Sequence, residues 1–458
     1  MEYQLDRPGE RRLGAYLSQV GAVLKNKRQR ESFATYAMGL LGEGERKSAE
    51  PIAARACADP DEVDAAHQRL TYFTRGAEWS DGDVRRVAAR YAIAAMTKRT
   101  AVSAWIVDDT GFLKQGKHSV GVQRQYTGSA GKITNCQVGV SLTIATQSDH
   151  VPVDFELYLP GSWANDPARR AEAHIPDAVM FKPKWELALD MIERAVVAGL
   201  PPGLLLADAA YGNNAEFRRR VRCKGLDYAV GINSNSTVWR LDRHGRSVGA
   251  PVAVGDLAIA IRRRGFRKTT WRQGTKTKLS SRFAAERVRL ASDDLADPSQ
   301  REAVWLLMEW PDSEDAPTGF SVATLPAMLT RKQLVRRIKE RWRTERVYED
   351  AKGELGLDHF EGRSFRGWHH HVSVVIACFA FIVAERIRAF SHGKKKVFTR
   401  ANPPRRSTPF TEPPRAPLPQ LIYHHPPRGR TRTHLVATTL PPMPPPENYN
   451  LTTHSPSP

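Results

Sequence analysis

Three acidic residues, Asp109, Asp208 and Glu345, stand where their carboxylates could share one site. Asp109 and Asp208 each lie at the end of a short apolar run that is typical of a β-strand. Glu345 lies in a stretch without Gly or Pro that is rich in helix-forming residues. Carboxylates that converge from two strands and a helix form an oxygen-rich site for Mg²⁺ or Mn²⁺. Two such ions activate a water or a 3′-hydroxyl, so the predicted chemistry is phosphodiester cleavage or transfer.

Each acid also has a plainer interpretation. Asp109 could form a turn before Thr110, Asp208 could be an ordinary acid at a strand end, and Glu345 could form ion pairs along a solvated helix. The first acid is also ambiguous, because Asp108 directly precedes Asp109. Successive strand residues point to opposite faces, so only one of these two can face the metal ions.

Arg341, Glu345, Tyr348 and Lys352 would share one stripe of the helix that carries the third acid. On an α-helix with about 100° per residue, their spacing places them within about 60° of one another. One carboxylate is thereby flanked by two cations and a phenol. This pattern suits a surface that binds phosphate groups beside a metal-binding acid.

The composition favours nucleic acid as the partner. The 458 residues include 69 Lys and Arg against 49 Asp and Glu, which gives a net charge of +20 and a pI near 10.0. Such a charge suits nucleic acid or an anionic membrane, but the longest apolar run, 372–384, is too short to span a bilayer. The four cysteines form no C-x-x-C pair, and the first residues do not resemble a signal peptide, which fits a reducing cytoplasm.

The elements that must position these residues change character along the chain. We expect a helical N-terminal domain that could bind DNA, then an α/β core with the order β-β-β-α-β-α-β, a β-rich insertion, the C-terminal helices of the core, and a disordered Pro/Arg-rich tail. The core should be a mixed sheet with flanking helices. The expected boundaries of these five segments are 1–100, 101–233, 234–325, 326–390 and 391–458.

Aromatic residues in the insertion form a second candidate contact with nucleic acid. Basic stretches such as 262–272, expected to be a loop, are interleaved with Trp239, Phe266 and Trp271. These side chains could stack on bases and neutralise a strand, or they could be ordinary aromatics of β-strands. The run 369–371 (His-His-His) is not expected to bind a metal, because consecutive helical residues point in different directions.

Taken together, these motifs resemble those of bacterial insertion-sequence transposases of the DDE type, which have an RNase H-like catalytic domain with a β insertion. The segments V-D-D-T-G-F-L-K-Q-G-K-H-S-V-G and L-A-D-A-A-Y-G-N-N are similar to those holding the first two acids. Arg341, Glu345 and Lys352 fit the Y-x2-R-x3-E-x6-K signature of one group of this family. The resemblance covers about residues 30–390.

The resemblance implies a set of roles. Asp109, the acid directly before Thr110, would be the first catalytic and metal-binding acid, together with Asp208 and Glu345, around two Mg²⁺ (or Mn²⁺) ions. Arg341 and Lys352 would position DNA phosphates. The Tyr of the signature falls on Ile338, so Tyr348 would replace it as a DNA contact, or the contact is absent.

The activity implied by the resemblance is metal-dependent cleavage of DNA at the ends of an insertion sequence, followed by strand transfer into target DNA. The partners would be the terminal inverted repeats and the target DNA, bound by a homodimer at the nucleoid in the bacterial cytoplasm. Trp271 could receive a base unstacked beside a hairpin. Two alternatives are a metal-dependent nuclease of the same fold without strand transfer and a non-catalytic DNA-binding protein derived from a transposase.

Overall fold

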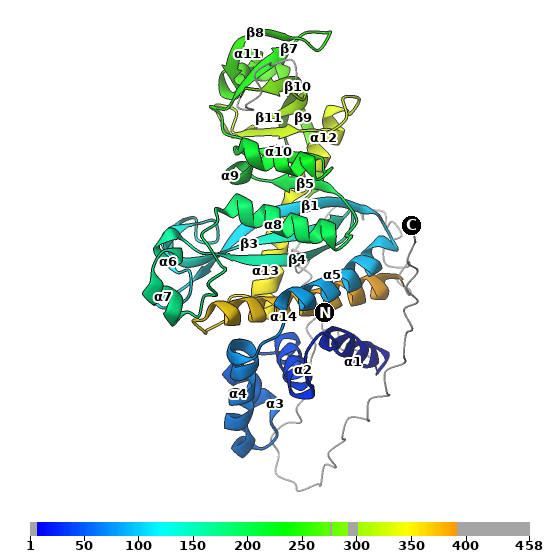
Figure 1. The fold of residues 1–458 in the computed structure, drawn as a ribbon. Coiled ribbons are helices and arrows are strands. Elements are labelled where there is room, and N and C mark those ends of the chain that lie inside the picture. The colour runs from blue at the N-terminus through cyan, green and yellow to red at the C-terminus, as the bar shows by residue number, and fades with distance from the viewer. Residues whose placement is uncertain (1–6, 275–276, 292–300, 392–458) are drawn as a thin grey trace, which may run out of the picture. The chain divides into compact units, whose positions relative to one another are not determined.

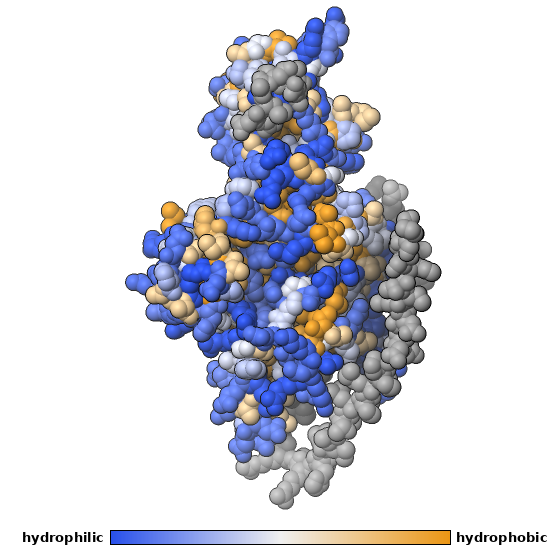
Figure 2. Space-filling model, in the orientation of Figure 1, coloured by the Kyte–Doolittle hydropathy of each residue, from blue (hydrophilic) through white to orange (hydrophobic). Residues whose placement is uncertain are grey.

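The computed structural model describes residues 7–274, 277–291 and 301–391 (Figure 1). The expected Pro/Arg-rich tail lies outside these residues apart from its first position. None of the helices described has the length and apolar character needed to cross a bilayer. On the face of the molecule shown in Figure 2, hydrophilic residues predominate and apolar residues gather in small patches.

The first hundred residues are helical, as expected. The Ser80 side chain caps the last of these helices by accepting a hydrogen bond from the Asp83 backbone N–H. The elements are α1 (Arg7–Gly21), α2 (Lys27–Leu41), α3 (Ala49–Ala56), the 3-10 turn η1 (Pro60–Glu62), α4 (Val63–Thr71), the π-helical turn η2 (Tyr72–Gly76) and α5 (Asp81–Thr97).

A mixed sheet follows and confirms the expected α/β class. Its first strands are β1 (Val102–Leu113), β2 (Gln123–Thr127), β3 (Lys132–Thr146), β4 (His150–Tyr158), β5 (Leu204–Ala207) and β6 (Tyr228–Gly231). The core order is β4-β3-β1-β5-β6. Strands β1, β5 and β6 run parallel to one another, β3 is antiparallel to β1, and β4 is antiparallel to β3. The connecting helices are α6 (Gly161–Ala164), α7 (Pro167–Glu172), α8 (Lys184–Val197), α9 (Ala209–Gly212) and α10 (Ala215–Cys223).

The expected β-rich insertion extends this same sheet. Its last strand, β12, pairs antiparallel with β6 through the partners Ser321 and Gly231. The expected loop at 262–272 is wrong, because this stretch forms the end of α11 and most of β9. The elements are β7 (Thr237–Leu241), β8 (Ser247–Ala253), α11 (Val254–Gly265), β9 (Arg267–Gln273), β10 (Lys278–Leu290), β11 (Val304–Trp310) and β12 (Gly319–Ala323).

The helix expected around Glu345 forms, except that Arg341 precedes its first residue. Helix α12 (Arg331–Ile338) is followed by the 3-10 turn η4 (Lys339–Arg341), and α13 (Trp342–Leu355) begins one residue after Arg341. Gly356, at φ 64°, ends α13 in the left-handed conformation that glycine adopts without strain. The long buried helix α14 (Phe365–Ser391) follows and lies beside α5 (Figure 1).

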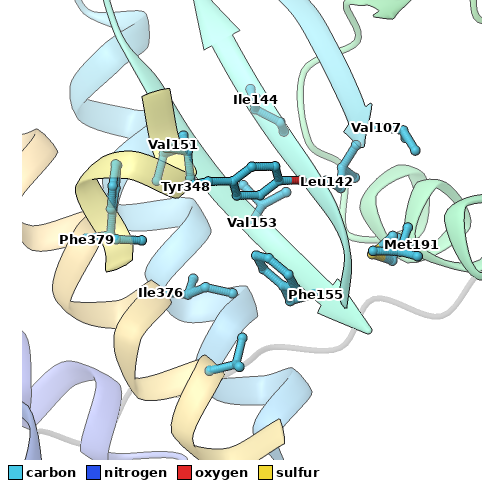
Figure 3. Packing of buried hydrophobic residues seen from close by; sticks show 14 of the residues in the cluster. Val107, Leu142, Ile144, Val151, Val153, Phe155, Met191, Tyr348, Ile376 and Phe379 are labelled. Carbon is cyan, nitrogen blue, oxygen red and sulfur yellow. The ribbon is translucent and has the colours of Figure 1, made fainter. Parts of the chain in front are cut away.

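Side-chain contacts assign the two faces of the sheet. Ser141 and Thr143 of β3 bond to side chains of α13, so α13 covers the face to which they point. Asp109 of β1 bonds to Lys184 at the start of α8, on the opposite face. Figure 3 shows the packing on the α13 side, where Tyr348 meets Phe155 of β4 and Ile376 of α14 lies near them.

Candidate active site

Asp108 lies on the face of the sheet that α13 covers. It pairs in register with Ser141, and paired residues of antiparallel strands share a face. One carboxylate oxygen, Oδ2, accepts a hydrogen bond from Arg341 Nη1 at 2.7 Å. Burial raises the pKa of Asp108 to about 7, against the lowering effect of Arg341, and the nearby carboxylates of Asp208 and Asp109 add to the rise.

Asp208 stands next to Asp108 because β1 and β5 are parallel neighbours. Ile106 pairs with Leu206, and continuing this register by two residues brings Asp108 and Asp208 to the same face. β5 ends at Ala207, as the sequence predicts, and the Asp208 side chain caps α9 by accepting a hydrogen bond from the Ala210 N–H at 3.0 Å. The strand end thus positions one acid beside another.

Glu345 approaches the same place from the first turn of α13. Its side chain is exposed, and Oε1 lies 3.5 Å from Arg341 Nη2. The same guanidinium holds Asp108, so Arg341 lies between an acid of the sheet and the acid of the helix. The Asp208 carboxylate is also near enough to raise the pKa of Arg341.

Asp109 faces the other side of the sheet. Its Oδ2 accepts a hydrogen bond from Lys184 Nζ at 2.9 Å. The alternative that Asp109 forms a turn is wrong, because β1 continues beyond it to Leu113. Of the two adjacent acids, the structure therefore brings Asp108, and not Asp109, to the face that α13 covers.

Lys352 lies at the edge of this group of acids. Its Nζ donates to the Thr110 hydroxyl at 2.9 Å and to the Gly111 carbonyl at 2.7 Å, and it lies 3.2 Å from the Ser129 hydroxyl. Burial lowers its pKa. The cation is thus fixed two residues beyond Asp108 along β1, within reach of a phosphate bound at the acids.

Tyr348 does not face solvent, so the expectation that it contacts DNA is not supported. Its ring is 8% exposed and lies 6.1 Å from Phe155, centroid to centroid, within the packing drawn in Figure 3. Its hydroxyl shares a 2.6 Å hydrogen bond with the Ser141 hydroxyl. Ile338, at the position of the signature's Tyr, also packs against buried residues.

Trp271 is half-buried and its ring contacts neighbouring side chains, which argues against the expected stacking of a base on its ring. The ring packs edge-to-face on Phe283 at 5.7 Å, and Lys339 Nζ lies 5.0 Å from its centroid. The next residue, Arg272, reaches the helix that carries Glu345, because its guanidinium lies 3.6 Å over the ring of Trp342 at the start of α13. The sequence does not predict this contact, because it depends on the long-range placement of β9.

Tyr211 is a second residue near the acids that the sequence motifs did not predict. It follows Asp208 by three residues, which is about one helical turn, and its side chain is 1% exposed. Its hydroxyl has no hydrogen-bond partner among the described residues. Burial raises its pKa well above the usual value, and the carboxylates of Asp109, Asp108 and Asp208 raise it further. The spacing of three residues between Asp208 and Tyr211 is the sequence feature that could have placed Tyr211 near the acids.

The carboxylates of Asp108, Asp208 and Glu345 are of the type that binds a hard divalent cation, but they do not lie close enough together to act as its ligands. Among the described residues, no three His, Cys, Asp or Glu side chains lie together closely enough to hold a metal ion. The Arg341 guanidinium instead bridges Asp108 and Glu345. Burial, together with the carboxylates of Asp208 and Asp109, raises the pKa of Asp108 to about 7. A divalent cation would offset the negative charge of these carboxylates.

The three consecutive histidines of α14 make structural contacts. The His369 ring lies 3.3 Å from Glu156, His370 contacts the carbonyls of Thr74 and Trp79, and His371 contacts the Tyr36 hydroxyl. The rings therefore point toward different elements, as expected for adjacent helical positions.

Comparisons with known proteins point to one family. The family described as DDE superfamily endonuclease matches residues 19–278, which include Asp108, Asp109 and Asp208 but end before Glu345. The chain is also similar to the probable transposase for insertion sequence element IS701 of Microchaete diplosiphon, with 28% identity over 214 residues. That alignment covers 46% of this chain and 51% of the relative, so the chain spans about half the length of the curated relative that it matches.

Proposed function

Because the chain belongs to the DDE superfamily of endonucleases, we propose that it is an insertion-sequence transposase. It cleaves DNA at the ends of its element and transfers the freed strands into target DNA. The observation that carries this proposal is the meeting of Asp108, Asp208 and Arg341 on the face of the sheet to which α13 brings Glu345.

Asp108, Asp208 and Glu345 are the three acids of the proposed site. Asp108 replaces Asp109, which the motif resemblance favoured, because Asp109 faces α8 and pairs with Lys184. Endonucleases of this superfamily generally use divalent metal ions. Mg²⁺ or Mn²⁺, as a pair of ions, would supply Lewis acidity and an activated water or 3′-hydroxyl at these carboxylates.

The cations beside the acids would handle the DNA phosphates. Arg341 exchanges its partners Asp108 and Glu345 for a phosphate when the site is loaded, and its planar guanidinium suits a bidentate contact. Lys352, held by Thr110 and Gly111, fixes the neighbouring phosphate. Both offset the negative charge that develops during phosphodiester cleavage.

The remaining segments of the chain would serve DNA binding and assembly. The basic composition supports terminal inverted repeats and target DNA as partners, bound by a homodimer in the bacterial cytoplasm at the nucleoid. In this proposal the helical N-terminal domain, residues 1–100, contacts DNA. Residues 101–233 and 326–390 form the catalytic core, with 234–325 as an insertion that shares its sheet.

The proposal is tested with supercoiled DNA that carries the ends of the element and with Mg²⁺. We expect wild-type protein to nick and join DNA, and Asp108→Asn and Glu345→Gln to abolish both reactions. Glu349→Gln is the matched control, because Glu349 lies on the same helix, is exposed and pairs with Arg346. Equal cleavage by wild type and Glu345→Gln contradicts the assignment of the acids.

The same assay separates the other possibilities. Loss of cleavage in Asp109→Asn with cleavage retained in Asp108→Asn would return the role of first acid to Asp109. Cleavage without joining indicates a nuclease of the same fold. Binding to the ends without cleavage indicates a DNA-binding protein derived from a transposase.

A further inference from the structure

The hairpin formed by β2 and β3 carries an exposed apolar pair. Tyr126 and Ile133 stand directly opposite each other on the two strands. Their side chains are 64% and 60% exposed. Large apolar side chains grouped on a protein surface mark sites of interaction more often than scattered ones do.

A cation on the same face flanks this pair. Arg124 lies two residues before Tyr126 on β2, so their side chains point to the same face, whereas Lys132, directly before Ile133 on β3, points to the opposite face. Arg124 is exposed, and no ion pair or side-chain hydrogen bond joins it to another described residue. An exposed apolar pair bordered by an unpaired cation fits a polyanion that also offers flat apolar surfaces, as the bases and phosphates of DNA do.

The turn of the hairpin is fixed against the candidate active site. The Ser129 hydroxyl lies 3.1 Å from that of Thr110 and 3.2 Å from Lys352 Nζ. Thr127 packs against Gly111 so closely that a Cβ on Gly111 would lie 2.0 Å from the Thr127 hydroxyl oxygen. The hairpin thus has a defined position beside the cations of the site.

The apolar pair also lies on the catalytic side of the sheet. Ile133 and Ser141 are eight positions apart along β3, which is an even number, so they point to the same face. Ser141 bonds to Tyr348 of α13, the helix that carries Glu345. The exposed pair therefore continues the surface on which the acids and Lys352 lie.

We propose that the β2–β3 hairpin is a DNA wedge. In this arrangement, which rests on the proposed function, Tyr126 and Ile133 press between bases beside the scissile phosphate and unstack them. Arg124 holds a neighbouring phosphate. Apolar wedges that separate base steps are a common way to distort a duplex, and distortion admits the phosphate to a site that lies beside the turn of the hairpin.

The test uses full-length protein and a duplex end that carries 2-aminopurine, a fluorescent base, at the positions next to the cleavage site. We expect wild-type binding to increase the fluorescence, because the base leaves the stack. The double variant Tyr126→Ala/Ile133→Ser should lose most of this increase. Its cleavage of paired DNA should fall about tenfold to a hundredfold and recover on DNA with mismatched bases at those positions.

The matched control is Met180→Ala/Val197→Ser, which removes two similarly exposed apolar side chains that are not part of the hairpin and should behave as wild type. An unchanged fluorescence signal in the hairpin variant overturns the wedge. The wedge is also overturned if the hairpin variant changes its oligomeric state without DNA and keeps the fluorescence increase. That result would mean that Tyr126 and Ile133 bind a second copy of the chain. If wild type cleaves no DNA but the fluorescence depends on Tyr126 and Ile133, the wedge stands and the proposed function fails.

Discussion

Removing the hydroxyl of Tyr211 should stabilise the protein. The hydroxyl is buried and has no hydrogen-bond partner among the described residues, so folding takes it out of water without replacing its hydrogen bonds. An unsatisfied buried polar group of this kind costs about 1–3 kcal/mol. Tyr211→Phe keeps the ring that contacts Phe217 and should raise the free energy of unfolding by about that amount in the absence of divalent metal ions.

Tyr348→Phe is the matched control and should have the opposite effect. Its hydroxyl is also buried but shares a 2.6 Å hydrogen bond with Ser141. The substitution leaves the Ser141 hydroxyl without this partner, and we expect a loss of about 1–3 kcal/mol. Urea unfolding of wild type and both variants, in buffer with a chelator, measures the two differences under identical conditions.

The same pair of variants tests why the chain keeps a costly hydroxyl. Tyr211 lies beside Asp109, Asp108 and Asp208, and its O–H is a donor that a carboxylate can accept when the acids rearrange around a cation. We therefore expect Tyr211→Phe to weaken Mn²⁺ binding severalfold, measured by titration calorimetry, while Tyr348→Phe leaves it unchanged. A Tyr211→Phe protein that is less stable than wild type would refute the reasoning, because it would mean that the hydroxyl has a partner in the folded state.

Two further outcomes follow from the packing. Burial lowers the pKa of His150 to about 3 and that of His371 to about 4, whereas the same histidines in an unfolded chain bind protons near pH 6.5. As the pH falls from about 6.5 to 4, the free energy of unfolding should therefore fall by about 1.4 kcal/mol per pH unit for each histidine. Urea unfolding of His150→Leu should show a shallower fall, and an equally steep fall would mean that the His150 ring is protonated in the folded protein. Gly111→Ala should displace the β2–β3 hairpin, because the new Cβ meets Thr127, and should reduce DNA cleavage at least tenfold. Gly116→Ala is the control and should cleave as wild type, because no atom lies within 4 Å of its new Cβ. Equal cleavage by the two variants would contradict a fixed hairpin.

Local sequence patterns predicted the elements that carry the acids. The apolar run before Asp208 ends where β5 ends, and of the adjacent Asn213 and Asn214 it is Asn214 that caps α10. The hairpin of β3 and β4 and the helix α8 also lie where their patterns place them. These features depend on residues that are close in the chain, so propensity and capping are sufficient to find them.

The face that each side chain occupies could not be predicted in the same way. Choosing between Asp108 and Asp109 requires the register of β1 with β3 and β5, and these pairings join residues far apart in the chain. Tyr348 falls on the expected stripe of the helix, but the sheet covers that side of α13, so its ring is buried. Helical spacing groups residues on a stripe without revealing whether the stripe meets solvent or sheet.

The pairing of β12 with β6 means that the insertion is not a removable module. β6 pairs with β5 on one side and with β12 on the other, so it is an interior strand only while the insertion is present. A chain from which 234–325 had been deleted would expose the backbone N–H and C=O groups of β6 as a bare edge one strand away from Asp208. Such edges pair with other chains, and we expect the shortened protein to aggregate.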